Sequence, residues 1–274
     1  APQYVNGRMT SDFQIAQNLP WMGTLQAQAA AAELDTDVAR AQLAAVELDV
    51  IQSVKKAYYE LYFVERAIRI TTTEQKSVAQ FVDVAETRFR VGKASQQDIL
   101  RAQLEVAAVN SELIRLRQQL TSSKATLNRL LHATPETDVQ SLPQLPVESL
   151  PEDLHALYSL AIQARPELQG ALSAIQRERQ KVELAHLKYY PDMTVSTGWA
   201  DMTTNGAMSP LSDGRGNWNL GLMVNIPIYR KRLDAAVREA ETMVVAGARE
   251  YDAMRDETLE AVKDQFAQAQ RQQE

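Results

Sequence analysis

The chain has 274 residues, of which 45% are hydrophobic and 23% are charged, a composition typical of a folded protein rather than a disordered one. Its formal net charge of −6 argues against nucleic acid as a partner, because nucleic acid requires a basic surface. The absence of cysteine excludes disulfide bonds and thiolate metal sites. No apolar run reaches the roughly 18 residues that a membrane-spanning helix needs.

The first predicted element is a strand at residues 10–20. Phe13, Ile15 and Leu19 alternate with other residues, Gln17 interrupts the apolar series, and Pro20 ends it. This spacing places the three apolar side chains on one face of the strand.

Two long helices are predicted next, at about residues 24–90 and 96–133. No proline occurs between Pro20 and Pro135, and Gly92 is the only glycine between Gly23 and Gly170. At 1.5 Å per residue the helices would be roughly 100 Å and roughly 57 Å long. Such lengths exceed a globular core and favour a coiled-coil or barrel-stave architecture.

Apolar residues recur every seven positions in both predicted helices. They are Leu43, Val50, Ala57 and Val64 in the first helix, and Ile99, Val106, Leu113, Leu120 and Leu127 in the second. A sustained seven-residue period indicates left-handed supercoiling against a neighbouring helix. A simple coiled-coil dimer shows the same period, so the heptads alone leave that alternative open.

The turn between these helices has a recognisable sequence. Gly92 can adopt the left-handed conformation that ends a helix. Ser95 can accept a hydrogen bond from the first turn of the next helix, and Asp98 stands where the acid of a capping box reaches back. Residues 91–95 are therefore predicted to form the tip of a helical hairpin at residues 21–133.

An irregular segment is predicted at residues 134–165, because it contains Pro135, Pro143, Pro146 and Pro151. A short helix is predicted within it at about residues 152–164. Pro166 then opens another helix, at a first-turn position where its missing N–H has no cost. This helix is predicted to cover residues 166–190.

Two further strands are predicted within residues 191–229. One face of the first strand carries Met193, Val195, Thr197 and Trp199. One face of the second carries the apolar residues Trp218, Leu220, Leu222, Val224 and Ile226, opposite polar or small residues with Met223 as the one exception. Strands of this length with one apolar face match the span of an outer-membrane β-barrel. A soluble hairpin packed on a helix would show the same alternation. Aromatic residues at the two ends of these strands suit membrane interfaces, at Tyr189, Tyr190 and Tyr229 on one side and Trp199 and Trp218 on the other.

The chain repeats itself at a period of about 207 residues. Asn18-Leu19-Pro20 matches Asn225-Ile226-Pro227, and each follows an alternating strand and precedes a long Ala-rich helix. The second of these helices is predicted at residues 230–274. A two-fold repeat of strand, proline and long helix indicates a pseudo-symmetric unit, of the kind that forms one stave of a barrel.

Four motifs in this order resemble the outer membrane efflux proteins, the TolC-like outer membrane factors. They are Gln17-Asn18-Leu19-Pro20-Trp21-Met22-Gly23, residues 88–100 around Gly92, Arg165-Pro166-Glu167-Leu168 and Asn225-Ile226-Pro227-Ile228. The resemblance implies a mainly α fold with a two-fold internal repeat. Long antiparallel helical hairpins would form the staves of a periplasmic α-barrel, and a few strands would contribute to a transmembrane β-barrel. Residues 134–165 would belong to an equatorial collar.

The resemblance also implies a function and partners. The full-length protein would be a homotrimer in the outer membrane that extends into the periplasm and serves a tripartite pump. It would export small molecules or metal ions and contact a periplasmic adaptor, an inner-membrane transporter and outer-membrane lipid. The adaptor would meet the hairpin tip, at Arg88, Arg90, Gly92, Lys93, Ser95 and Asp98. An ordinary solvated tip would carry the same residues.

The sequence departs from the family pattern in two ways. It supplies three of four expected strands, and it lacks the second hairpin tip, so it is expected to be truncated at both ends of the repeat. We expect such a piece not to close a native pore, because open sheet edges are not tolerated in lipid. The exported compound, the identity of the pump partners, N-terminal lipidation and the gate residues are not predicted.

No catalytic, cofactor or metal site is predicted, and the chain is not expected to be an enzyme. His132, His155 and His186 are far apart in the sequence, and no pair has metal-ligand spacing. The basic run Arg230-Lys231-Arg232 suggests contact with phospholipid head groups, or else a solvated basic turn.

Two other classes of protein compete with the outer-membrane channel. A periplasmic adaptor would also have a long helical hairpin, but it would need Gly-rich lipoyl-like strands that are absent here. A coiled-coil scaffold would leave the amphipathic strands and the repeat unexplained.

Overall fold

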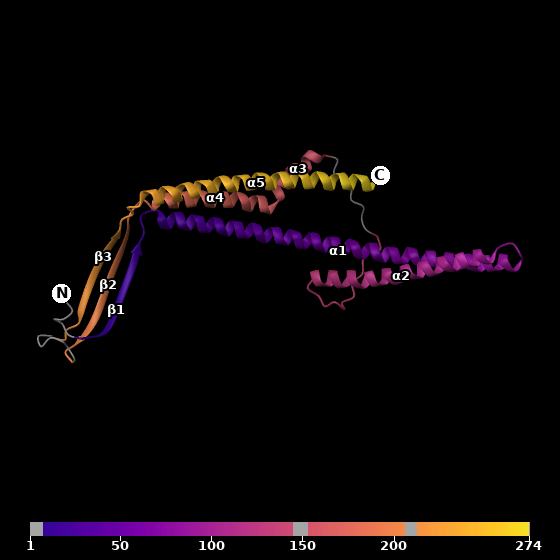
Figure 1. Cartoon of the computed structure of the whole chain (residues 1–274), viewed down its shortest axis with the longest axis horizontal. Helices are drawn as coiled ribbons and strands as arrows, with labels where there is room; N and C mark the ends of the chain where they lie inside the picture. Colours follow the sequence, from indigo (N-terminus) through magenta and orange to yellow (C-terminus); the bar gives the residue numbers. More distant parts are fainter. Residues whose placement is uncertain (1–7, 145–152, 206–212, 274) are drawn as a thin grey trace. The chain divides into compact units, whose positions relative to one another are not determined.

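The computed structural model describes residues 8–144, 153–205 and 213–273. It contains long helices and one small sheet (Figure 1). The elements are β1 (Arg8–Leu19), α1 (Thr24–Arg90), α2 (Gln96–Leu130), α3 (Leu154–Ala164), α4 (Pro166–Leu187), β2 (Asp192–Thr203), β3 (Asn217–Asn225) and α5 (Arg230–Gln273). Among the helices within these ranges, none is both long and apolar enough to cross a bilayer.

The chain divides into two compact units. One comprises residues 1–43 and 151–274, and the other comprises residues 44–150. The helix α1 contributes its first part to the unit with the sheet and its remainder to a helical hairpin with α2.

In the first unit the three strands form an antiparallel sheet in the order β1-β2-β3. The helices α3 and α4 pack against α5, and Figure 1 shows α4 running alongside α5. Leu168, Ile175 and Val237 are buried among these helices. The helices α1 and α4 approach closely at Gly170, where an added Cβ would lie 3.0 Å from the Cβ of Ala41.

In the second unit the later part of α1 lies antiparallel to α2. The buried side chains between them are Leu61, Val64, Val78, Val109, Leu113, Leu116 and Leu127. Polar side chains also cross the interface, since Gln75 Nε2 donates to Asn110 Oδ1 at 2.5 Å and Gln119 Nε2 donates to Glu60 Oε1 at 2.6 Å. The predicted heptad positions Leu113 and Leu127 of α2 therefore face α1. Leu43 and Val50 of α1 are exposed in the single chain.

Two helices end earlier than the sequence predicts. The helix α2 ends at Leu130 rather than at residue 133, because His132 takes a left-handed backbone conformation with φ 55°. The N–H of Ala133 then donates to the carbonyl of Asn128 at 2.8 Å, which closes the helix with a Schellman-type turn. The helix α4 ends at Leu187 rather than at residue 190.

The irregular segment predicted at 134–165 is described in part. Residues 134–144 lie along the hairpin, whereas Pro146 and Pro151 fall outside the described residues. The buried Asn128 holds this segment, because its Nδ2 donates to the carbonyls of Pro135 and Thr137 at 3.1 and 2.8 Å. The segment is thus fixed to the end of α2 away from the hairpin tip.

Candidate functional site

One face of the sheet is largely apolar. The strand register aligns the alternating residues in four cross-strand rows, Phe13–Trp199–Trp218, Ile15–Thr197–Leu220, Gln17–Val195–Leu222 and Leu19–Met193–Val224. The large apolar side chains of these rows are 38% to 72% exposed. From the Met193 row to the Trp199 row the surface extends roughly 20 Å along the strands. An exposed apolar surface of this extent calls for an apolar environment.

The opposite face of the sheet carries polar and small side chains, with Met223 as the exception. They are Asp12, Gln14, Ala16 and Asn18 in β1, Thr194, Ser196, Gly198 and Ala200 in β2, and Asn217, Asn219, Gly221, Met223 and Asn225 in β3. Space on this face is limited, because a Cβ added at Gly221 would lie 2.6 Å from Ser196 Oγ. The sheet therefore has one mainly apolar face and one mainly polar face.

Aromatic side chains cluster where the sheet meets the helices. The rings of Trp21 and Tyr190 stack with their centres 4.9 Å apart. The backbone N–H of Trp21 donates to Asp192 Oδ1 at 3.0 Å, which joins the end of β1 to the start of β2. Trp21 is not among the predicted interface residues. Its contact with Tyr190 could not be predicted, because the two residues are distant in the sequence.

The predicted interface residues have different surroundings in the structure. Trp199 and Trp218 pair directly in the row farthest from the helices. Tyr229 is 76% exposed, and Tyr190 is half exposed beside Trp21. Tyr189 contacts protein groups instead, since its hydroxyl donates to Asp234 and the guanidinium carbon of Arg230 lies 5.4 Å from its ring centre. Whether these residues meet lipid stays a prediction.

The hairpin tip is a pair of helix caps joined by a short turn. Gly92 has φ 71°, a conformation that favours glycine. The N–H of Lys93 donates to the carbonyl of Arg88 at 2.8 Å, and the N–H of Gly92 donates to that of Phe89 at 2.9 Å. These two bonds form the Schellman arrangement that ends α1.

The second helix of the hairpin begins with the predicted capping box. The N–H of Asp98 donates to Ser95 Oγ at 3.3 Å, and the N–H of Ser95 donates to Asp98 Oδ2 at 2.9 Å. The backbone and hydroxyl hydrogen bonds from Ser95 lower the pKa of Asp98, so its carboxylate stays charged. The turn is therefore set by local hydrogen bonds.

All six residues predicted to contact an adaptor lie together at this tip and are exposed. They are Arg88, Arg90, Gly92, Lys93, Ser95 and Asp98. Phe89 and Val91 are also exposed between them, although the sequence analysis does not single them out. The tip thus presents three cations and two apolar side chains on a turn closed by local hydrogen bonds.

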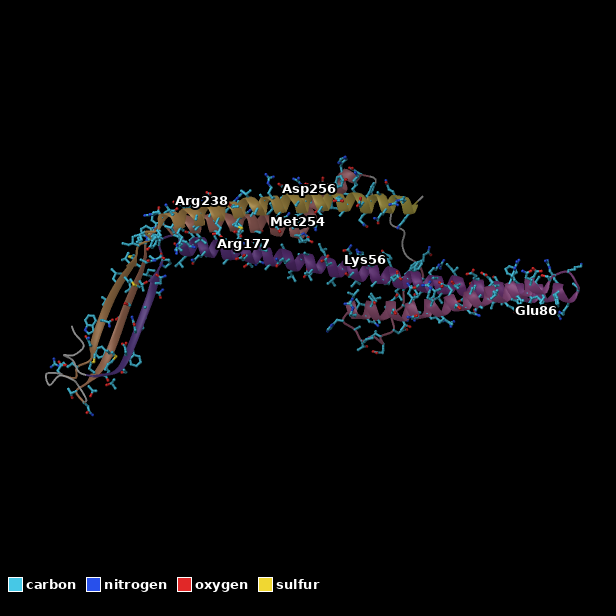
Figure 2. The ribbon with its side chains drawn as sticks, viewed as in Figure 1. Lys56, Glu86, Arg177, Arg238, Met254 and Asp256 are labelled. Carbon is cyan, nitrogen blue, oxygen red and sulfur yellow. The ribbon has the colours of Figure 1, made fainter. Side chains whose placement is uncertain are left out.

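A groove of about 700 Å³ lies among α1, α4 and α5 in the first unit. Arg177, seen in Figure 2, bonds Asp35 Oδ1 and Glu178 Oε1, both at 2.8 Å. The hydrogen bond that Arg177 donates to Asp35 raises the pKa of Arg177. Burial alone would raise the pKa of Glu178, but bonds from Lys181 and Arg177 lower it. These paired charges join α1 to α4, and we assign no ligand to the groove.

The described residues contain no group of three or more acidic or histidine side chains that could hold a metal ion. His132 lies in the turn after α2, His155 in α3 and His186 in α4. The structure does not bring the three histidines together into a ligand set.

The family model of the outer membrane efflux proteins matches residues 6–132 and 157–274. The chain belongs to the outer membrane efflux protein family. The match covers both strand-to-helix junctions, the hairpin and its tip, and α5. The family is one of transport channels. The duplicated strand and helix, with the proline between them, are consistent with this family.

Two curated relatives align with most of this chain. The chain is 25% identical over 238 residues to the cobalt-zinc-cadmium resistance protein CzcC of Cupriavidus metallidurans, covering 85% of this chain and 54% of that protein. It is 21% identical over 244 residues to the outer membrane protein TolC of Vibrio cholerae, covering 88% of this chain and 55% of that protein. The chain thus spans about half the length of the curated relatives it matches.

A solved structure shares the fold. The outer membrane protein VceC of Vibrio cholerae superposes with a TM-score of 0.77 at 19% identity, over 94% of this chain and 62% of that one. At this identity the likeness shows the fold alone. The mainly helical fold, with its few strands, is that of an outer membrane efflux protein.

Proposed function

We propose that the protein is the outer-membrane channel component of a tripartite efflux pump. One observation carries this proposal: the apolar rows of the sheet are exposed on one face, and the same chain continues from that sheet into α1 and α5. A sheet with one apolar and one polar face suits the wall of a membrane barrel, in which the apolar face meets lipid and the polar face lines the interior. The family match supports the same conclusion.

The assembly that we propose is a homotrimer in the outer membrane, extending into the periplasm. Within residues 8–144, 153–205 and 213–273, β1 and β3 are the two edges of the sheet. Edges in lipid must pair with further strands, and the fourth expected strand of the complete protein and neighbouring protomers would supply them. Residues 10–20 and 191–229 would then lie in the barrel, residues 21–133, 166–190 and 230–274 in the periplasmic staves, and residues 134–165 at the equator.

The cargo would be small molecules or metal ions. The name of CzcC states resistance to cobalt, zinc and cadmium. Other similar proteins are named for drugs, such as the antibiotic efflux pump protein ArpC of Pseudomonas putida. Nothing among the described side chains favours one of these two classes.

The test of this function is the mass of the complete protein extracted from outer membranes in detergent, measured by light scattering with the detergent subtracted. A stable trimer is expected. A monomer or dimer that needs no detergent would overturn the proposal. That outcome would favour the periplasmic adaptor or the coiled-coil scaffold.

The tip of the hairpin is the surface that we propose for the periplasmic adaptor. Reversing its charge with Arg88→Glu, Arg90→Glu and Lys93→Glu is expected to weaken adaptor binding by on the order of tenfold or more, because like charges at an interface repel. Binding of the purified adaptor to the immobilised trimer measures the effect. Drug or metal susceptibility of cells carrying the variant gives an independent readout.

The matched control makes the same change of charge elsewhere on α1, with Lys55→Glu, Lys56→Glu and Arg69→Glu, all exposed in the single chain. The control should form trimers and bind the adaptor as the unchanged protein does. Equal loss in both triple variants would show a general electrostatic effect and remove the tip from the proposal. Unchanged binding by the tip variant would do the same.

A further inference from the structure

Basic side chains gather where the sheet meets the helices. Arg230, Lys231 and Arg232 begin α5, and Lys188 follows the end of α4. All four residues are exposed. A helix N-terminus is an unfavourable place for cations, because the helix dipole is positive there. The local backbone therefore does not account for this cluster.

Neither neighbouring acid forms an ion pair with the cluster. Asp192 accepts the N–H of Trp21 at 3.0 Å, and Asp234 accepts the hydroxyl of Tyr189. Within the described ranges of the chain, no carboxylate lies within ion-pair distance of the four cations, whereas some other cations of the same unit, such as Arg177, have acidic partners. The charge of the cluster is thus available to an anion from outside the chain.

The apolar surface of the sheet runs directly into this cluster. The apolar series of β3 continues at the same spacing of two residues through Ile226 and Ile228, both about two-thirds exposed or more. Arg230, the first residue of α5, follows Tyr229 two positions after Ile228. A hollow of about 570 Å³ is lined by Ile228, Tyr229, Arg230, Lys231 and Arg232.

Apolar and basic surfaces in this order match the two ends of an anionic lipid. Acyl chains would cover the rows that end at Val224, and a phosphate would meet the cations that follow. Guanidinium groups bind phosphate oxygens in pairs, and lysine adds a point charge. Tyr190, which stacks on Trp21, follows Tyr189, whose ring lies beside Arg230, and aromatic residues are enriched at membrane interfaces.

We propose that Arg230, Lys231 and Arg232, with Lys188, bind the phosphate of an anionic phospholipid in the membrane leaflet next to the helices. The proposal rests on the proposed function, because it requires the sheet to lie in the outer membrane. Arg230 is held over the ring of Tyr189, so its position is preorganised. Lys231 and Arg232 have no such contact among the described residues and supply the adjustable part of the site.

The test measures lipid binding to the complete protein, delipidated in detergent, by native mass spectrometry. The probes are phosphatidylglycerol and phosphatidylcholine with identical acyl chains. The unchanged protein is expected to prefer phosphatidylglycerol by about tenfold, because each basic residue near an anionic surface contributes on the order of a fewfold. The variant Lys231→Gln with Arg232→Gln retains the Arg230–Tyr189 contact and should prefer it by less than about threefold.

Three controls separate the outcomes. Arg88→Gln with Arg90→Gln removes the same charge at the hairpin tip and should leave the lipid preference intact. Lys231→Arg with Arg232→Lys keeps the charge and should also retain it. Inorganic phosphate at millimolar concentration should not displace the lipid. Displacement by phosphate alone, or equal loss in the tip variant, would overturn the lipid site.

The outcome for the lipid site is distinguishable from that for the channel. A trimer in the outer membrane that binds both lipids equally would overturn this inference and leave the proposed function standing. If the protein is not extracted from the outer membrane as a trimer, both the lipid site and the proposed function are overturned. Normal trimer formation by the Lys231→Gln, Arg232→Gln variant shows that a lost preference is not a folding defect.

Discussion

Arginine in place of Leu222 is expected to prevent assembly in the outer membrane, whereas arginine in place of the adjacent Met223 is expected to be tolerated. Leu222 lies in the apolar row with Val195, near the middle of the surface, and Met223 pairs with Thr194 on the polar face. A lipid-facing arginine at mid-bilayer depth costs about 2–4 kcal/mol in a membrane barrel, and a lumen-facing substitution mainly changes selectivity.

The two variants form a matched pair, because they introduce the same charge at neighbouring positions of one strand. The yield of trimer in isolated outer membranes, detected by electrophoresis without heating, compares them directly. The yield of trimer should decrease at least about tenfold for Leu222→Arg, because every protomer carries the cost of placing arginine in lipid. Equal yields would place the two faces of β3 in the same environment and contradict the membrane assignment of the sheet.

The faces of this sheet could be predicted from the sequence, but its pairing could not. Alternation along one strand fixes which residues share a face, and this is a local property. The register that aligns Phe13 with Trp199 joins residues far apart in the chain, and no local signal specifies it. Periodicity likewise does not predict that Trp199 pairs with Trp218.

The helices show a similar division. The scarcity of Gly and Pro predicts α1 and α2 closely, because a helix interior excludes both residues. The heptad period of the sequence indicates one seam of α2, which contains Leu113 and Leu127. The structure adds a second seam three residues later, at Ala102, Val109, Leu116 and Ser123, of which the last three are buried. Its alternation of alanine, large apolar and serine side chains weakens the periodic signal.

The candidate sites differ in how far the sequence predicts them. The tip could be predicted because its caps are formed by residues within a few positions, such as Ser95 and Asp98. The membrane-interface set was harder, because a tyrosine beside a strand can serve either the protein or the lipid. Tyr189 donates to Asp234, and Trp21 stacks on Tyr190, and both contacts depend on tertiary structure.

Leu168→Ala is expected to destabilise the first unit, which contains α4, by about 2–5 kcal/mol, the usual cost of a buried leucine-to-alanine cavity. Leu168 is 1% exposed in the first turn of α4. Relaxation should be small, because α1 and α4 already meet closely two residues later, where a Cβ on Gly170 would lie 3.0 Å from Ala41. The helices therefore have little room to close over the void.

Leu168→Met is the matched control, since a volume-conserving change costs less than about 1.5 kcal/mol. The thermal midpoint of the helical circular dichroism signal, measured on the complete protein in detergent, should fall clearly for alanine and little for methionine. Equal midpoints for the two variants would mean that volume at this position does not limit stability. The close approach at Gly170 would then not restrain α1 and α4, and the packing argument for this unit would fail.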